Sequence, residues 1–274
     1  LELSIKSFAR SFRNKSEAVI GDDHILNNMS LLKKIYDAYK ENETAIASGF
    51  KSKEHDFAAK LKQKSTVKSL KGYINWQKNP TKYKMPYGTG PISINLDLTS
   101  ACNFAGPFCV DSEIINSGKM LCLEEIKRTI AVLKPRGLLS VILLGGGEPT
   151  LHRDFERIVR YIKGKGMQLG IVTNGTRLDK VIKVAKLLKK KDWVRISIDA
   201  AKESTFKASH NPKIKVMRKD ILAKAKELKR ENPLISLGYS FVIVWKGAEI
   251  NGKRLLPNIN EMAEATRLAR GNLF

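Results

Sequence analysis

The sequence contains no apolar run that approaches the ~18 residues needed to span a bilayer. Residues 1–6 also lack the charged stretch and following apolar core that mark a signal peptide. Hydrophobic residues still make up 42% of the 274 positions, enough to bury a sizeable core. We therefore expect a globular protein of the cytoplasm without membrane contact. A fragment of a longer protein stays open as an alternative, because the chain does not start with Met and segment 259–274 stops in mid-pattern.

Acidic residues are few beside basic ones: 27 Asp and Glu stand against 50 Lys and Arg, a formal charge of +23. A field of that sign attracts nucleic acid and other anions. The lysines of segment 178–191, however, recur at helical spacing opposite an apolar stripe, which is typical of a solvated helix face. Aromatic residues make up only 7% of the chain, and no basic run is interleaved with them as a single-strand platform requires. An RNA-binding or RNA-modifying protein is therefore an open alternative that the charge pattern does not favour.

Cysteine and histidine are both scarce. Cys102, Cys109 and Cys122 are too few for a disulfide framework in so long a chain, and their grouping favours a metal or redox site. Cys122 opens a helical pattern, where a small buried residue is the competing interpretation. A zinc site that adds His152 lacks the short ligand spacing of structural zinc loops. The other histidines stand alone, so the sequence predicts no acid–base dyad. They are His24, His55 and His210.

Breaker residues divide the chain near position 90. Proline and glycine cluster within 80–91, whereas the region before them carries helical patterns at 25–43 and 56–70. We expect residues 1–90 to be a helical N-terminal extension with a linker, and residues 91–274 to be the core domain.

Strand and helix patterns alternate from residue 92 onward. Strands are expected at 92–98, 138–144, 167–173, 193–198 and 235–244. Helices are expected at 123–133, 154–163, 178–190, 216–230 and 260–270. This alternation predicts an α/β fold with a parallel sheet covered by helices. A barrel and a doubly wound open sheet both satisfy it, and periodicity does not separate them.

Polar and glycine-rich segments follow the expected strands directly. They are the loop from Cys102 to Cys109, then Gly145-Gly146-Gly147-Glu148, Thr173-Asn174-Gly175 and Ser197-Ile198-Asp199. In either architecture the carboxyl ends of the strands meet at one rim, where active sites lie. Asn95 and Asp97 line the lumen of a barrel if the polar face of the first strand points inward.

The glycine run after the second strand suits a small ligand. Successive glycines let the backbone approach a ligand closely, and Glu148 offers a carboxylate to a cationic partner. An amino-acid ligand fits better than a dinucleotide, because Thr150 stands where the dinucleotide fingerprint needs glycine.

These loops resemble those of the radical S-adenosylmethionine enzymes, from about Ile92 to Val244. In that family three cysteines, separated by three and then two residues, hold a [4Fe-4S] cluster. Cys102 and Cys109 match the outer positions, and Phe108 matches the aromatic residue that packs near adenine. The remaining matches are to contacts with S-adenosylmethionine. They are Gly146, Gly147 and Glu148 for the methionine amino group, Thr173 and Asn174 in the third-strand loop, and Ser197 and Asp199 for the ribose or the carboxylate.

The resemblance implies a partial TIM-type (β/α)6 barrel with a [4Fe-4S] cluster and S-adenosylmethionine as cofactors. If the chain is a fragment, the barrel stops before its last strand. The implied activity is reductive cleavage of S-adenosylmethionine to methionine and a 5′-deoxyadenosyl radical, which abstracts hydrogen from a substrate. An electron donor such as flavodoxin or ferredoxin is the implied partner. The sequence does not identify the substrate, a small molecule or a peptide.

Gly106 stands where the family has its middle cysteine, and glycine has no side chain with which to ligate iron. Because Asn103, Phe104, Pro107 and Phe108 keep the family's loop character, we favour a recent or artificial loss of one cysteine. The alternatives are a substitute ligand, a lost cluster with retained cofactor binding, and a domain that kept only the fold. Substitute ligands are Cys122 first, then the oxygen donors Asp111 and Asn103.

Two functional hypotheses follow from these features. The first is a radical S-adenosylmethionine enzyme whose activity depends on position 106. The second is a non-catalytic domain that binds S-adenosylmethionine or a related ligand.

Overall fold

A computed structural model of the chain describes residues 64–82, 90–250 and 252–271. The chain divides into two compact units, Leu1–Ser52 and Lys53–Phe274, and the first lies outside the described residues. The helix expected at 25–43 lies outside them as well. Of the helix expected at 56–70 only the second half is described, within α4 (Lys64–Lys78). The division into an extension of 1–90 and a core of 91–274 therefore stays a prediction.

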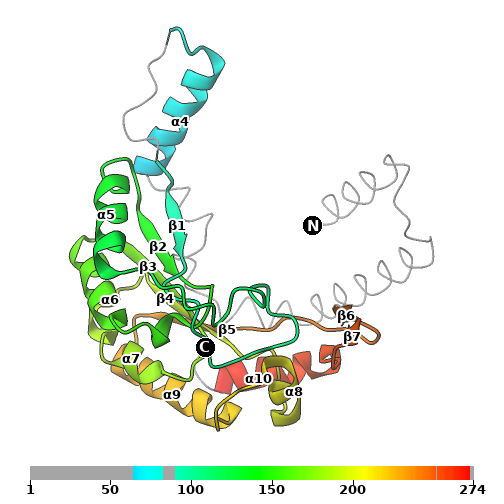
Figure 1. The fold of residues 1–274 in the computed structure, drawn as a ribbon. Helices are drawn as coiled ribbons and strands as arrows, with labels where there is room; N and C mark the ends of the chain where they lie inside the picture. Colours follow the sequence, from blue (N-terminus) through cyan, green and yellow to red (C-terminus); the bar gives the residue numbers. More distant parts are fainter. Residues whose placement is uncertain (1–63, 83–89, 251, 272–274) are drawn as a thin grey trace, which may run out of the picture. The chain divides into compact units, whose positions relative to one another are not determined.

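Five parallel strands form the sheet of the core, in the same order as in the sequence (Figure 1). They are β1 (Ser93–Leu96), β2 (Ser140–Leu143), β3 (Gln168–Thr173), β4 (Trp193–Ser197) and β5 (Ser236–Ser240). Each new strand is added on the same side of the one before, as in a TIM-type barrel, whereas a doubly wound sheet reverses direction at a switch point. The sheet therefore has the barrel topology.

The barrel is partial, because the described strands form an open row from β1 to β5. A sixth parallel strand of the expected (β/α)6 barrel is not found among the described residues. After β5 the chain forms a separate antiparallel hairpin of β6 (Glu249–Ile250) and β7 (Lys253–Arg254).

Helices cover the outer face of the sheet, as Figure 1 shows for α5, α6, α7 and α9. The helices of the core are α5 (Leu123–Leu133), α6 (Phe155–Gly164), α7 (Leu178–Ile182), α8 (Glu203–His210), α9 (Arg218–Glu231) and α10 (Met262–Gly271). Single 3-10 turns are η1 (Pro149–Leu151), η2 (Ala185–Leu187) and η3 (Ile259–Glu261). In α6, Phe155, Ile158, Val159 and Ile162 recur at helical spacing and are fully buried, so this stripe packs into the core.

Two expected elements are shorter in the structure. The helix expected at 178–190 breaks into α7 and η2. Asn232, which follows α9, donates hydrogen bonds to the carbonyl oxygens of Ala185 (2.7 Å) and Leu188 (2.8 Å) in this segment. The strand expected at 235–244 ends at Ser240, because the N–H of Val242 donates to the carboxylate of Asp199 rather than to a neighbouring strand. Both the break in the helix and the end of the strand therefore involve residues that are distant in the sequence.

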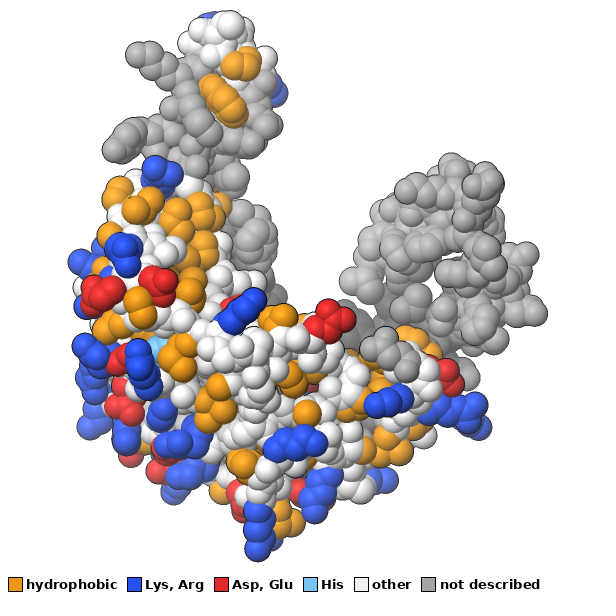
Figure 2. Space-filling model, viewed as in Figure 1, with side chains coloured by type: hydrophobic (Ala, Val, Ile, Leu, Met, Phe, Trp, Pro, Cys, Tyr) orange, Lys and Arg blue, Asp and Glu red, His pale blue; other side chains and the backbone are white. Residues whose placement is uncertain are grey.

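Lys and Arg side chains are spread over the visible surface of the outer helices, with Asp and Glu among them (Figure 2). Some are paired locally, as Arg157 is with Asp154 at 2.7 Å. Such a mixed surface is typical of solvated helix faces. Within the described ranges, no helix combines the length and the apolar character that crossing a membrane requires.

Candidate functional site

The loop that carries two of the cysteines follows β1 and lies against the end of α8. We call residues 99–112 the cysteine loop. Phe104 forms an isolated antiparallel bridge with Pro212, and the N–H of Lys213 donates to the carbonyl of Asn103 (2.9 Å). The N–H of Ala105 donates to the carbonyl of His210 (3.1 Å). Backbone contacts therefore fix the loop on the segment after β4.

Aromatic packing reinforces this contact. Phe104 is buried, with its ring centroid 5.9 Å from that of Phe206 and 5.5 Å from that of His210. The ring of Phe108 lies 6.3 Å from that of His210. Phe108, expected near the adenine of a cofactor, therefore lies beside α8 at the rim.

The two thiols of the cysteine loop are free and partly buried. Burial raises the pKa of the Cys102 thiol, and although the N–H of Phe104 opposes this, the charges of Glu148 and Cys109 add to it. Cys102 therefore favours the neutral thiol over the thiolate that binds metal.

Cys122 has a different place, as the N-cap of α5. Its N–H donates to Oε2 of Glu125 (2.6 Å), which closes a capping box. His152 is also committed: Nε2 lies 2.8 Å from the carbonyl of Leu121, and Nδ1 accepts the N–H of Asp154 (3.0 Å). In the described parts of the chain, no three His, Cys, Asp or Glu side chains gather as metal ligands.

Gly106 packs directly on the backbone of α8. A β-carbon on Gly106 would lie 2.5 Å from the carbonyl oxygen of Ser209 and 3.4 Å from Cα of His210. Distances of that kind require the backbone to move before any side chain can stand there. With two thiols and a closely packed glycine, the residues present do not fit a cluster held by three thiolates.

The glycine run after β2 packs against the start of the cysteine loop. Gly145 and Gly146 have φ of +61° and +67°, a region that favours glycine. A β-carbon on Gly145 would lie 2.5 Å from Oδ1 of Asp97, and Gly146 forms a parallel bridge with Thr99. The run therefore allows close approach between two loops of the rim. Asp97, predicted to line the lumen, lies beside this run, and burial and then the charge of Asp111 raise its pKa.

Glu148 ties the loops after β2 and β3 together. Its side chain is buried, and its carboxylate accepts hydrogen bonds from the N–H and hydroxyl of Thr150, the hydroxyl of Thr173 (2.7 Å) and the N–H of Asn174 (2.6 Å). Burial raises the pKa of Glu148 even though these donors favour the carboxylate. The Glu148 carboxylate thus joins the loop after β2 to the loop after β3.

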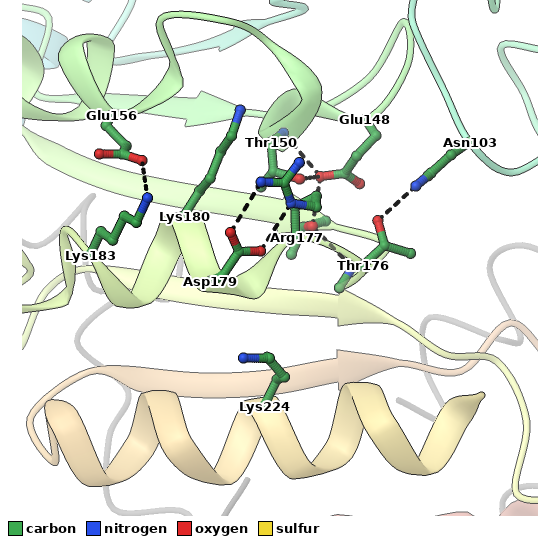
Figure 3. Close-up of polar contacts among 12 residues, drawn as sticks. Asn103, Glu148, Thr150, Glu156, Thr176, Arg177, Asp179, Lys180, Lys183 and Lys224 are labelled. Atoms are coloured by element: carbon green, nitrogen blue, oxygen red, sulfur yellow. Dashed lines mark hydrogen bonds and ion pairs between the residues drawn. The ribbon is translucent and has the colours of Figure 1, made fainter. Parts of the chain in front are cut away.

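Amide side chains extend this network to the cysteine loop. Nδ2 of Asn174 donates to Oδ1 of Asn103 (2.7 Å), and Nδ2 of Asn103 donates to Oγ1 of Thr176 (2.9 Å), as Figure 3 shows for the second bond. The loops after β1, β2 and β3 are therefore joined by side-chain hydrogen bonds. The nearby ion pair of Arg177 with Asp179 (3.0 Å) belongs to the start of α7.

Asp199 lies after β4 and pairs with a histidine that the sequence leaves isolated. Its φ is +51°, and its buried carboxylate accepts the N–H of Val242 (2.7 Å) and the hydroxyl of Ser240 (3.2 Å). Nε2 of His210 lies 3.4 Å from Oδ2 of Asp199 and 2.8 Å from the carbonyl of Ile198. Burial raises the pKa of Asp199 and lowers that of His210. No sequence signal marks this pair, because α8 alone brings His210 back to the end of β4.

The predicted residues thus form two connected groups at one rim. Glu148, Thr173 and Asn174 belong to the hydrogen-bond network, and Asp199 joins the aromatic cluster through His210. Ser197 is half-buried at the end of β4 and pairs in register with Ser240. Cys122 lies apart from both groups as a helix cap.

A match to a family model identifies the family of this chain. The family model described as Radical SAM superfamily matches residues 96–247, more than half of the chain. The chain belongs to the radical S-adenosylmethionine superfamily, whose members use a [4Fe-4S] cluster and S-adenosylmethionine.

Two curated relatives are similar over this region. The S-adenosylmethionine-dependent nucleotide dehydratase of Selenomonas ruminantium is 35% identical over 154 residues, 55% of this chain and 56% of the relative. The probable GTP 3′,8-cyclase of Thermoplasma volcanium is 35% identical over 164 residues, 58% of this chain and 47% of the relative. The chain spans about half the length of the curated relatives it matches.

A solved structure shares the fold at low identity. SuiB of Streptococcus suis, bound to the precursor peptide SuiA, has a TM-score of 0.58 and 14% identity, and the match covers 87% of this chain and 51% of SuiB. The same protein bound to S-adenosylmethionine gives a TM-score of 0.51 at 16% identity, with coverage of 89% and 58%. These likenesses support the partial barrel and say nothing further of this chain.

Proposed function

We propose that the rim formed by the loops after β1 to β4 binds S-adenosylmethionine. The observation that carries this proposal is the Glu148 network, which holds the loops after β1, β2 and β3 in one arrangement through buried and partly buried hydrogen bonds. A site that is already ordered spends little binding free energy on ordering its loops. Gly146, Gly147 and Glu148 match the family's cofactor segment, and Asp199 is its counterpart after β4.

We further propose that the second ligand of this domain is a nucleotide. Both relatives at 35% identity are named for reactions of nucleotides. Because this chain covers about half of each relative, the substrate is a proposal for this chain.

Radical formation is not assigned to the chain as it stands. The family's reductive chemistry depends on a cluster, and Gly106 packs where its third ligand belongs. The close contact with Ser209 means that a cysteine at position 106 requires the backbone to move, and a recent or artificial loss of that cysteine stays a prediction. The proposed activity is therefore binding, and an electron donor such as flavodoxin or ferredoxin stays a prediction tied to cluster assembly.

Calorimetric titration of S-adenosylmethionine into the anaerobically purified chain tests the proposal. Binding is expected, and Asn103→Ala is expected to weaken it by about tenfold, because this change unties the cysteine loop from Asn174 and Thr176. Asn260→Ala, at an exposed position in η3, is the matched control and should leave the affinity unchanged. Absence of binding by the unaltered, folded chain would sink the proposed cofactor site.

Reconstitution with iron and sulfide separates binding from radical chemistry. We expect the unaltered chain to hold no [4Fe-4S] cluster and to release no 5′-deoxyadenosine, with Gly106→Cys assayed beside it. A cluster and 5′-deoxyadenosine from the unaltered chain would show a substitute ligand and overturn the binding-only assignment, with Cys122→Ala as the next variant.

A further inference from the structure

A cavity of about 450 Å³ lies beside Gly106, apart from the Glu148 network. Its walls come from the cysteine loop, from the last turn of α8 with Asn211, and from the β6–β7 hairpin. These segments follow β1, β4 and β5, so the cavity belongs to the same rim as the proposed cofactor site. Its volume lies within the range of about 300 to 1,000 Å³ that is usual for small-molecule sites.

Two lysines from different elements give the cavity a positive charge. Lys207 comes from α8 and Lys253 from β7. The hydroxyl of Ser112 and the side-chain amide of Asn211 stand with them in the lining, and no described lining residue is acidic. Two ammonium groups with neutral hydrogen-bond donors suit a ligand that carries several negative charges.

Only one of these lysines stands where a helix terminus favours a cation. Lys207 lies in the last turn of α8, where a cation is favourable beside the helix carbonyls. Lys253 lies in a two-residue strand of the hairpin, outside any helix. In the part of the chain that the structure describes, the hairpin's Glu249 pairs with Arg254 (3.3 Å) rather than with Lys253. The second charge is therefore free to meet a ligand.

We propose that this cavity binds the phosphate chain of a nucleotide. The proposal deepens the proposed nucleotide ligand and rests on it. Pro107 and Ile250 add apolar wall against which a base or ribose can pack. Gly106 lines the same cavity, and its contact with Ser209 holds the cysteine loop against α8, so the glycine shapes the wall on that side.

Titration of the full chain with GTP, guanosine and tripolyphosphate tests this assignment. The variant is Lys207→Gln with Lys253→Gln. The matched control, Lys186→Gln with Lys219→Gln, removes the same charge from exposed positions in η2 and α9. Circular dichroism melting of each protein confirms folding, and S-adenosylmethionine is titrated into each one as well.

GTP and tripolyphosphate are expected to bind, with guanosine at least about tenfold weaker than GTP. Lys207→Gln with Lys253→Gln should weaken the binding of GTP by about tenfold or more. The control double variant should bind GTP with nearly unchanged affinity, and the affinity for S-adenosylmethionine should change little in either protein. Equal GTP affinity in the two double variants would overturn the proposal, and so would equal binding of guanosine and GTP.

Two further outcomes separate this inference from the proposed cofactor site. Lysine-dependent GTP binding without S-adenosylmethionine binding would support the phosphate cavity and reject the cofactor site. Tighter, lysine-dependent binding of a single-stranded oligoribonucleotide than of GTP would assign the cavity to RNA and overturn the nucleotide proposal.

Discussion

Gly106 and Ser209 lie so close together that position 106 has no room for a side chain: a β-carbon there would be 2.5 Å from the carbonyl oxygen of Ser209. The contact presses the cysteine loop against the end of α8. A cysteine at this position can enter only if the loop moves away from the helix. The glycine at position 106, where the family has cysteine, and the close packing of the cysteine loop on α8 therefore depend on each other.

Replacing Gly106 by alanine is expected to lower the free energy of unfolding by about 1 to 3 kcal/mol, because the new β-carbon meets backbone that cannot rotate away. Urea unfolding followed by circular dichroism measures the loss. Gly164→Ala is the matched control, since a β-carbon there meets nothing within 4 Å and Gly164 ends α6. Equal effects at the two positions would contradict the close contact.

Glu148→Gln is expected to cost about 1 to 3 kcal/mol of stability, because an amide in place of the carboxylate leaves one of its buried donors without an acceptor. Thr150→Val removes only the hydroxyl donor to Glu148 and should cost about 1 kcal/mol. Urea unfolding at neutral pH compares the two. A larger loss from Thr150→Val than from Glu148→Gln would contradict the central place of the carboxylate.

His210 should lower the stability of the protein as the solution is acidified below pH 6.5, whereas the raised pKa values of the buried Asp199 and Glu148 act in the opposite sense. Burial lowers the pKa of His210 below its usual 6.5, although Asp199 opposes this. The unfolded chain therefore takes up this proton more readily than the folded one, so the stabilisation is full above pH 6.5 and is lost below it.

Urea unfolding at pH values between about 7 and 5 measures this slope. His210→Gln keeps a donor that can reach the carbonyl of Ile198 and should flatten the dependence. Burial raises the pKa of Asp199, so Asp199 acts in the opposite sense, and removal of His210 takes away a charge that lowers the pKa of Asp199. Identical slopes for the two proteins would refute the assignment to His210.

Asn232→Ala is expected to cost about 2 kcal/mol of stability, because the buried carbonyls of Ala185 and Leu188 lose their donor. Since these groups lie at η2, away from the rim loops, the affinity for S-adenosylmethionine should not change. Unfolding and calorimetry on the same preparation give both values, and a parallel loss of affinity would mean that the segment acts on the site.

Local patterns account for the elements that were predicted well. The helix expected at 123–133 is α5, the strand expected at 167–173 is β3 with one residue less, and the helix expected at 216–230 is α9 shifted by one or two positions. Each has a run of apolar residues at its own period, which neighbours in the sequence establish. The helix α8 was missed because its eight residues carry no such stripe.

The sequence likewise predicts only part of the candidate site. That polar loops follow the strands is visible in the sequence, because each loop adjoins its own strand. The acceptors and donors of Glu148 are not visible, since Thr173 and Asn174 lie on another loop. The pairing of Asp199 with His210 depends on the path of α8, which no pattern predicts.

The sequence by itself determined the alternation of strands and helices, the family resemblance and the absence of a cysteine at position 106. These are properties of neighbouring residues. The family resemblance implied a barrel, but the alternation of elements did not separate it from a doubly wound sheet; the tertiary structure did, because strand order is a matter of pairing between distant segments. It also decided that Gly106 is held by a contact with Ser209, since the cysteine loop and α8 meet only when the sheet has brought the ends of β1 and β4 to one rim.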